Sequence, residues 1–455
     1  MTPLELQTID EATVGILAET GVRLEHDDVV RRMVEAGARP GLGPQDVRIP
    51  REMLAEYLCL APPSVQLAAR GEPAATLTPD GRSVFWTNPG LYMWTGDERR
   101  EARGADLAAV ARLCDHLDTI QGIMGMAISD VPPACRDFAG LRIIAENTRK
   151  HVRVLCFTPT GADALVQMKP VFPGPWFSIG FTAHGPLRWT HLALEIFRRT
   201  AGHGIPVTIN GEPVAGVSGP MTIAGSIAVG NAEILAGIVV NQVLEPGRPV
   251  IYNLGLAHAL DMRHATAITG GPENALFARA SAALGRFYRL PSASWVSTDA
   301  VFEDEQAALE KMFGFQTHMK NGVSLIWGMG QLESEMTMSL GQLMLDDERI
   351  RYIRRFRRGY AVNAGELQLD LIRSVGIAGS YLESDHTLAH FREVLFEPML
   401  LNRKRREGCT EPLMQAAHRM AGEIINADRE EKITGAELAE LRRVEEAFRA
   451  RIANG

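Results

Sequence analysis

The chain has 455 residues and a formal net charge of −8, which disfavours general nucleic-acid binding because phosphate recognition needs a basic surface. Hydrophobic residues make up 46% and charged residues 22%, ordinary values for a globular protein with a large core. The first residues lack the basic end and apolar block of a signal peptide, and we expect no apolar run long enough to span a membrane. Five scattered cysteines, an odd number, predict reduced thiols and a cytoplasmic location.

Along the chain, residues 1–82 are expected to form an N-terminal helical region, 83–330 a barrel core, and 331–455 a C-terminal helical region that completes the barrel surface. Short apolar runs typical of buried strands recur at 83–87, 119–124, 152–157, 176–181, 206–210, 249–254, 293–297 and 323–328. Helical patterns lie between most of them, at 105–117, 191–202, 231–244, 272–288 and 304–319. Eight strands alternating with helices predict an α/β fold, a (β/α)8 TIM barrel. A charged final helix is expected over 422–453.

Such a barrel carries its chemistry at the C-terminal ends of its strands. The polar and aromatic residues predicted there are Asn88, Thr158, Thr182, Asn210, Glu212, Asn253, His258, Thr298, Asp299, Trp327, Gln331 and Glu333.

Several common barrel chemistries lack their residues. His258 and His264 flank Asp261, but Arg263 stands between them, so surface or loop histidines are favoured over a metal site. The sequence has no CxxC pair, GxSxG elbow or GxxxxGK[ST] loop, and no lysine lies in a predicted strand to form a Schiff base. We therefore assign no catalytic residue and expect no metal.

Aromatic and acidic residues remain as binding candidates. Trp86, Tyr92 and Trp94 fall in one short segment beside the first barrel strand, and Trp327 and Glu333 lie at the last. Aromatic faces with a nearby carboxylate hold a quaternary ammonium ion by cation–π attraction. We predict that these residues contribute to a cage above the barrel; the alternative is that they are core and hairpin aromatics.

Several stretches, taken together and in order, resemble the trimethylamine methyltransferase family, which includes members that lack pyrrolysine and act on quaternary amines such as glycine betaine. They lie at 15–38, 47–65, 216–237, 247–255, 270–291, 297–312 and 385–398, and so cover nearly the whole chain. The resemblance implies a TIM barrel that transfers a methyl group from an amine nitrogen to the Co(I) of a separate corrinoid protein. The segment LIWGMGQLESEMT, after the last strand, contains only standard residues and no pyrrolysine, which favours a quaternary amine, with a betaine as the candidate, over trimethylamine. No DxHxxG cobalamin pattern is present, so we expect no tightly bound cofactor and a corrinoid supplied by a partner protein.

Two further positions are predicted in the light of the resemblance. Ser218 and Gly219 precede a helix, and the backbone N–H groups from Gly219 to Thr222 suit the carboxylate of a betaine, whereas Gly225, Gly230 and Gly237 favour close helix packing. His386 is predicted to reach the barrel mouth from the C-terminal region; alternatively, Asp385 or Thr387 caps a helix there.

Three functions remain open at this stage. The leading one is a cytoplasmic quaternary-amine:corrinoid methyltransferase that acts without nucleic acid or membrane, with a homo-oligomeric state left open. The second is a non-catalytic quaternary-amine-binding or regulatory barrel protein. The third, weaker, is methyl transfer to another acceptor such as a folate.

Overall fold

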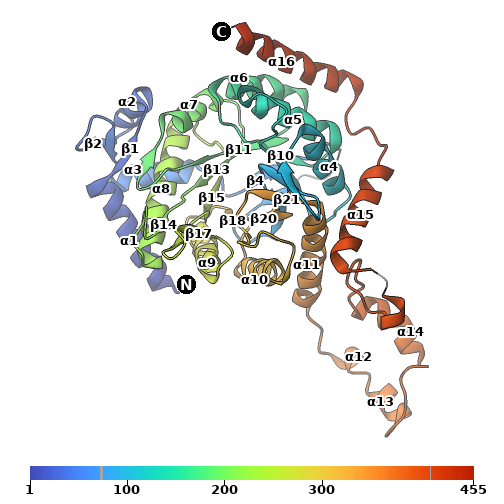
Figure 1. Cartoon of the computed structure of the whole chain (residues 1–455). Helices are drawn as coiled ribbons and strands as arrows, with labels where there is room; N and C mark the ends of the chain where they lie inside the picture. The colour runs from blue at the N-terminus through green and yellow to red at the C-terminus, as the bar shows by residue number, and fades with distance from the viewer. Residues whose placement is uncertain (72–74, 410, 455) are drawn as a thin grey trace.

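Eight parallel strands close into a barrel in the computed structural model, which describes residues 1–71, 75–409 and 411–454 (Figure 1). The strands are β6 (Val84–Thr87), β9 (Gly122–Met124), β10 (His151–Arg153), β11 (Phe177–Thr182), β13 (Val207–Asn210), β15 (Val250–Gly255), β18 (Ser292–Trp295) and β19 (Leu325–Met329). They follow one another around the barrel in chain order, and β19 pairs with β6 to close it. Each coincides with one of the eight predicted runs, and the predicted TIM barrel is confirmed.

A helix follows every barrel strand. These helices are α4 (Gly104–Asp115), α5 (Arg136–Asn147), α6 (Pro159–Met168), α7 (His191–Thr200), α8 (Ile223–Leu244), α9 (Pro272–Phe287), α10 (Glu305–Asn321) and α11 (Leu340–Arg358). The predicted helices match α4, α7, α8, α9 and α10 within a few residues, although α8 begins earlier than its predicted start at 231. Figure 1 shows this helical ring around the strands.

Helix α8 corrects one expectation. By length and composition it is apolar enough to cross a membrane, whereas the sequence was expected to hold no run of that length. However, 78% of its most apolar window is buried inside the protein, and it packs against α1 (Pro3–Gly15), α3 (Arg51–Leu60) and β15. A helix that is apolar on all sides suits such a core position. Added Cβ atoms at Gly230 and Gly237 would overlap neighbouring side chains, which confirms the close-packing role expected for these two glycines.

The N-terminal region contains short strands as well as the predicted helices. Besides α1 and α3 it holds η1 (Ile16–Thr20), β1 (Val22–Leu24), α2 (Asp27–Glu35), β2 (Arg39–Pro40), β3 (Asp46–Arg48), β4 (Val65–Leu67) and β5 (Ala75–Leu77). Val65, Leu67 and Leu77 of the β4–β5 pair share a buried cluster with Val84 and Leu325 inside the barrel. This pair therefore covers the N-terminal end of the barrel.

Two small sheets lie at the opposite end. One runs β20 (Gln331–Leu332), β21 (Thr337–Ser339), β7 (Tyr92–Trp94) and β8 (Arg99–Glu101), and the other β14 (Val214–Ala215), β16 (His258–Asp261) and β17 (Thr266–Ile268). They follow β6, β13, β15 and β19 directly, so they surround the barrel mouth. The remaining short elements of the barrel region are η2 (Pro133–Cys135), η3 (Lys169–Val171) and β12 (Arg188–Trp189).

The C-terminal part extends away from the barrel as α12 (Ala364–Leu367), α13 (Leu369–Val375) and α14 (Asp385–Val394), then returns through η4 (Arg406–Gly408), α15 (Leu413–Ala427) and α16 (Gly435–Asn454) (Figure 1). The single helix predicted over 422–453 is wrong, because α15 ends at Ala427 and α16 starts at Gly435. Lys432, between them, reaches Asp115 and Asp428, and Thr434 accepts a hydrogen bond from the Glu437 N–H at the new helix start. The domain boundaries at 83 and 331 stay a prediction.

The strand register fixes which side chains share a level inside the barrel. The register can be followed from strand to strand once around the barrel. Starting at residue 86 of β6, the path returns to the same strand at the position of residue 78. The shear number is therefore eight, as in other TIM barrels. Residues at the same height along the barrel axis, here called a level, are one position further along on each successive strand. Because side chains alternate between inside and outside, each level has inward-pointing residues from every second strand only. From the N-terminal end upward, three successive levels are Trp86, Arg153, Thr208 and Ala293; then Met124, Gly180, Asn253 and Trp327; then Asn88, Leu155, Asn210 and Trp295.

Candidate site at the barrel mouth

Two of the three predicted cage tryptophans lie inside the barrel, below its rim. Trp86 is fully buried and stacks on His151 with ring centroids 5.6 Å apart. Trp327 is 4% exposed and belongs, with Trp86 and Trp295, to a buried cluster inside the barrel. These indoles line the interior under the mouth.

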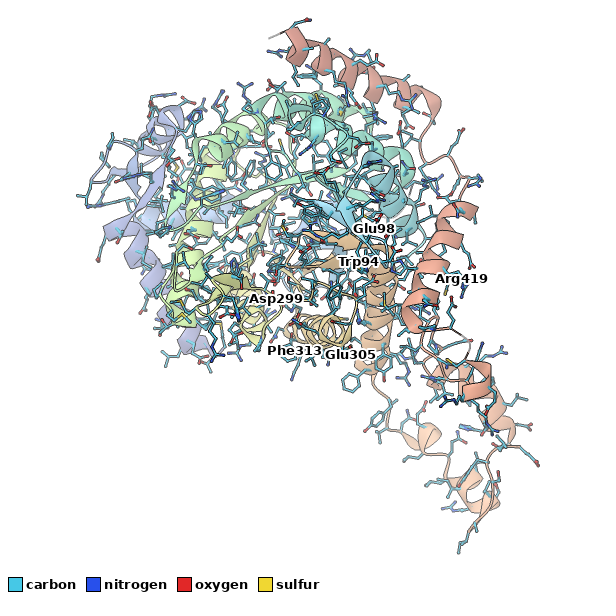
Figure 2. All side chains as sticks on the ribbon, in the orientation of Figure 1. Trp94, Glu98, Asp299, Glu305, Phe313 and Arg419 are labelled. Carbon is cyan, nitrogen blue, oxygen red and sulfur yellow. The ribbon has the colours of Figure 1, made fainter. Side chains whose placement is uncertain are left out.

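Trp94 belongs to a different layer, above the mouth. Its Nε1–H donates to Glu303 Oε2 at 3.1 Å, and its ring meets the edge of Phe302 at 5.7 Å. His418 of α15 also bonds this Glu303 carboxylate, at 2.9 Å. Figure 2 shows Trp94 close to the start of α10, marked by Glu305. The structure does not bring Trp94 together with the two interior tryptophans.

Tyr92 and Glu333 are brought together, with a cation of the protein between them. The Arg99 guanidinium carbon lies 3.4 Å from the Tyr92 ring centroid. The Nε of Arg99 donates to Glu333 Oε2 at 2.7 Å, and Thr337 Oγ1 donates to the same oxygen at 2.6 Å. Aromatic face and carboxylate thus hold a cation as the sequence predicted, but that cation is Arg99.

The loop before α8 uses one of the predicted N–H groups, that of Gly219, internally. The N–H groups of Ser218 and Gly219 both donate to Val214 O, at 3.0 and 3.1 Å, and Ser218 Oγ accepts from Val214 N–H at 2.8 Å. These groups close a turn, so this conformation does not offer them to a carboxylate.

His386 lies far from the other candidates within this chain. It stands in the first turn of α14, half-buried, with its ring 4.5 Å from that of His390. Arg355 and Arg358, near the C-terminal end of α11, donate to carbonyls of α14. Because α11 runs away from the mouth, α14 lies toward the opposite end of the barrel. The cap of α14 is Ser384, not Asp385 or Thr387.

Two carboxyl groups at the mouth were not among the predicted site residues. Glu212 follows β13 and Glu335 follows β20, and both are half-buried. Burial raises the pKa of Glu212 to about 7. Burial, reinforced by the charge of Glu212, raises the pKa of Glu335 to about 8. Glu212 stood among the strand-end positions of the sequence, whereas no sequence pattern marked Glu335.

Local structure positions both carboxyl groups. Residues Glu333, Ser334 and Glu335 all adopt positive φ, at 57°, 48° and 83°. Their backbone is held by the end of β18, since the Glu333 N–H donates to Ala300 O and the Ser334 N–H to Thr298 O. Glu233 of α8 accepts the backbone N–H of Leu187 at 2.9 Å, and burial raises the Glu233 pKa to about 7, with the charge of Glu212 acting in the same direction.

Amide and hydroxyl groups line the upper barrel below these carboxyls, with Asn253 on the level of Trp327 and Asn210 one level higher. Asn253 Nδ2 donates to Asn210 Oδ1 at 2.7 Å, and Asn210 Nδ2 donates to Thr182 Oγ1 at 3.0 Å. The mouth thus combines two acidic groups of raised pKa with a polar ladder over an aromatic interior. Such an arrangement can hold a small organic cation in a desolvated place.

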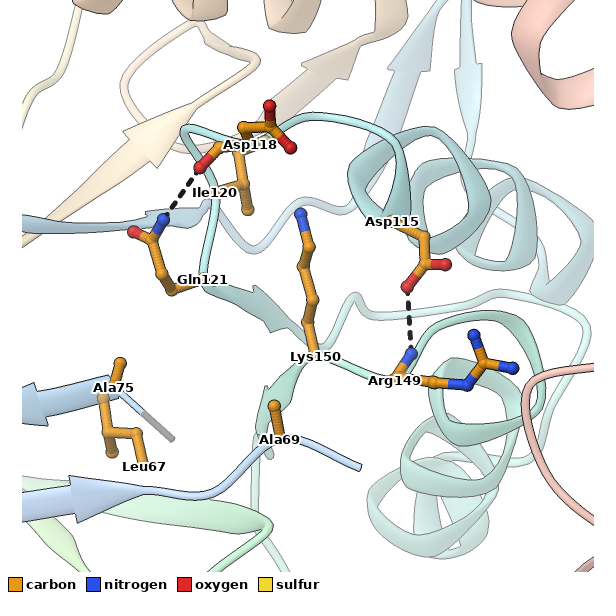
Figure 3. Close-up of a pocket in the computed structure, with 9 residues that line it drawn as sticks. All are labelled: Leu67, Ala69, Ala75, Asp115, Asp118, Ile120, Gln121, Arg149 and Lys150. Carbon is orange, nitrogen blue, oxygen red and sulfur yellow. Dashed lines mark hydrogen bonds between the residues drawn. The ribbon is translucent and has the colours of Figure 1, made fainter. Parts of the chain in front are cut away.

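A hollow at the other end of the barrel is a poorer candidate. Figure 3 shows it between the β4–β5 pair and the starts of β9 and β10, lined by Asp115, Gln121 and Lys150 among others. Lys150 Nζ donates there to the Leu117 carbonyl. The end at which strands begin is the stability face of a TIM barrel. Within the described residues, no three His, Cys, Asp or Glu side chains are grouped to hold a metal ion.

Comparison with known proteins agrees with the fold. The sequence model of the family "Trimethylamine methyltransferase (MTTB)" matches residues 1–449. The trimethylamine methyltransferase MttB of Desulfitobacterium hafniense is 30% identical over 421 residues, covering 89% of this chain and 84% of the relative. A glycine betaine methyltransferase of Desulfitobacterium hafniense is 28% identical over 424 residues, covering 89% and 86%. The crystal structure of the Methanosarcina barkeri monomethylamine methyltransferase is similar with a TM-score of 0.58 at 12% identity, covering 92% of this chain and 86% of that one.

Proposed function

The chain belongs to the trimethylamine methyltransferase family and is a methyltransferase, and from that premise we propose that it takes a methyl group from a quaternary amine, a betaine, and delivers it to the Co(I) of a partner corrinoid protein in the cytoplasm. The observation that carries the choice of a cation is the pair of half-buried carboxyl groups of raised pKa, Glu212 and Glu335, over an aromatic barrel interior. A permanent cation suits this place because it pairs with carboxylates and aromatic faces and has no N–H that needs an acceptor.

The chemistry asks little of the protein beyond positioning. The C–N bond of a quaternary amine breaks with its electrons moving to nitrogen, so a neutral tertiary amine leaves and no proton is transferred. The corrinoid supplies the nucleophile when its carrier docks. This chain holds the ammonium group near Glu212 and Glu335, directs one methyl toward the mouth, and excludes water with the small sheets that surround it.

The corrinoid is proposed to arrive on the partner. The sequence carries no DxHxxG cobalamin-binding pattern, and Trp86, Trp295 and Trp327 line the barrel interior and narrow it. The residues of this chain therefore fit a corrinoid presented from outside, at the mouth, and do not supply a cradle of their own.

The test combines the purified protein with cob(I)alamin and a panel of quaternary amines. Expected results are a tertiary-amine product, identified by mass spectrometry, and an absorbance change of the corrinoid for at least one betaine. Trimethylamine is expected to give neither. Binding of a quaternary amine by calorimetry with no demethylated product, also after a corrinoid carrier protein is added, would replace this proposal by a binding protein.

A further inference from the structure

One arginine inside the barrel has no carboxylate partner among the described residues. Arg153 points inward from β10 and is 7% exposed. Its Nη1 donates to the Val154 carbonyl, and burial lowers the Arg153 pKa to about 10 with no carboxylate of the described residues acting against that shift. At neutral pH the side chain is still a cation.

Other buried arginines of this chain have a carboxylate that opposes the effect of burial. Burial lowers the pKa of Arg248 and Arg70 to about 10 as well, but the charge of Glu245 acts against that shift at Arg248, and the charge of Asp115 does so at Arg70. Arg248 also donates to Ile205 O at 2.9 Å. Burying a charge without a partner is unfavourable, and Arg153 lacks the opposing carboxylate that the other two arginines have. An anionic ligand would supply the missing partner.

Further unpaired donors lie on the same levels of the barrel. The Nε1 atoms of Trp86 and Trp327 and the Oγ1 of Thr208 are buried and have no hydrogen-bond partner among the described residues. Trp86 and Thr208 share the level of Arg153, and Trp327 lies one level higher. Indole and guanidinium N–H groups only donate, so the set can be satisfied by an anion.

The space for the guanidinium is built into the neighbouring strand. A Cβ atom at Gly180, on the next level up, would overlap the Arg153 guanidinium. The charged head therefore rests against the backbone of β11 at the level of Trp327. Acceptors begin above it: the unpaired Oδ1 of Asn88 lies on the third level, and Glu335 lies at the rim.

We infer that Arg153, Trp86, Trp327 and Thr208 form a carboxylate-binding site inside the barrel, beneath the ammonium site at the rim. Charge then runs from positive at depth to negative at the mouth, complementary to a zwitterion with its carboxylate down and its methylated nitrogen up. The orientation rests on the proposed function, whereas the anion site rests on the barrel interior alone. A plain amine leaves Arg153 uncompensated and is repelled by it, so the site selects betaines.

The test measures binding by calorimetry without any corrinoid. Glycine betaine and choline share a trimethylammonium head and differ in carboxylate against hydroxyl. The wild-type protein is expected to bind glycine betaine roughly 10- to 100-fold more tightly than choline, the range of a hydrogen-bonded charge pair. In Arg153→Met the preference is expected to vanish while choline binding is retained. Arg248→Met, equally buried but outside the barrel interior, is the matched control and should keep the preference.

Milder variants guard against misfolding. Trp327→Phe removes one indole N–H and is expected to weaken glycine betaine binding by roughly 3- to 10-fold with choline unchanged. An unchanged preference in folded Arg153→Met or Trp327→Phe protein, or equal affinity of the wild type for both ligands, overturns the inference. Carboxylate preference without methyl transfer leaves the anion site standing and refutes the proposed function. If betaines are demethylated equally well by the wild type and by Arg153→Met, the proposed function stands and the anion site is refuted.

Discussion

Affinity for a quaternary ammonium ion should rise with pH, because the two carboxyl groups at the mouth must ionise to hold it. Burial raises the pKa of Glu335 to about 8 and that of Glu212 to about 7. A bound cation stabilises the ionised form, lowers both pKa values and releases protons. The raised pKa belongs to the free protein, so binding is weak below it and reaches its plateau above it.

The size of the effect follows from the ionised fraction. A carboxyl group with a pKa near 8 is ionised to about 1% at pH 6, 10% at pH 7 and 50% at pH 8. Binding that requires ionised Glu335 therefore strengthens about tenfold from pH 6 to 7 and about fivefold from pH 7 to 8, then levels off. Glu212 steepens the curve below pH 7.

Calorimetry with tetramethylammonium from pH 6 to 9, in buffers of different ionisation enthalpy, measures both the affinity and the released protons. Glu335→Gln should leave only the step of Glu212, so that the affinity rises about twofold above pH 7 and levels off near pH 8. Glu333→Gln, two residues away and paired with Arg99, is the control and should keep the wild-type profile. A pH-independent affinity in the wild type, or a Glu335→Gln profile identical to it, would refute the reasoning.

Three other variants test the packing and the rim. Gly122→Ala places a methyl group against the Trp86 indole, and urea denaturation should show a loss of about 1–3 kcal/mol; unchanged stability would contradict the tight barrel level. Lys311→Met breaks the buried ion pair with Asp346, whose N–O distance is 2.9 Å. The expected loss of unfolding free energy is about 3 kcal/mol, at the lower end for buried pairs, because Arg349 still contacts Asp346. A smaller loss than in a variant of an exposed ion pair would argue against this reasoning. Arg99→Ala frees the Tyr92 ring, and tetramethylammonium should bind roughly 2- to 5-fold more tightly; equal affinity removes this ring from the substrate site.

The strands were predictable from sequence because parallel barrel strands are buried on both sides. Such strands read as short continuous apolar runs, and all eight runs became barrel strands. The break between α15 and α16 was harder to see, because residues 428–434 are charged like the helices around them. It depends on Lys432, whose partner Asp115 is over 300 residues away in the chain.

The cage was only partly predictable, because a position at the end of a strand does not tell how deep its side chain lies along the barrel axis. Trp86 and Trp327 were correctly assigned to strands, and period-two alternation turns both inward. Their depth is set by the barrel shear, which no single strand encodes. Likewise, Arg99 reaches Tyr92 because β7 and β8 form an antiparallel pair, a contact that composition alone does not reveal.

The stretch from Glu333 to Glu335 connects backbone strain with the site. Eight non-glycine residues of the described chain have positive φ, and three of them are consecutive here. Such conformations cost free energy, of order 1–3 kcal/mol each, and persist where surrounding contacts determine them. Here Asp299 accepts from the Ser334 hydroxyl at 2.8 Å, and the end of β18 holds two backbone N–H groups of the loop. In an extended backbone the side chains of Glu333 and Glu335, two residues apart, would point to the same face. The left-handed path instead sends Glu333 outward to Arg99 and leaves Glu335 half-buried beside Glu212. Glu333 thereby pairs with a cation of the protein, Arg99, and Glu335 remains available for the cation of a ligand.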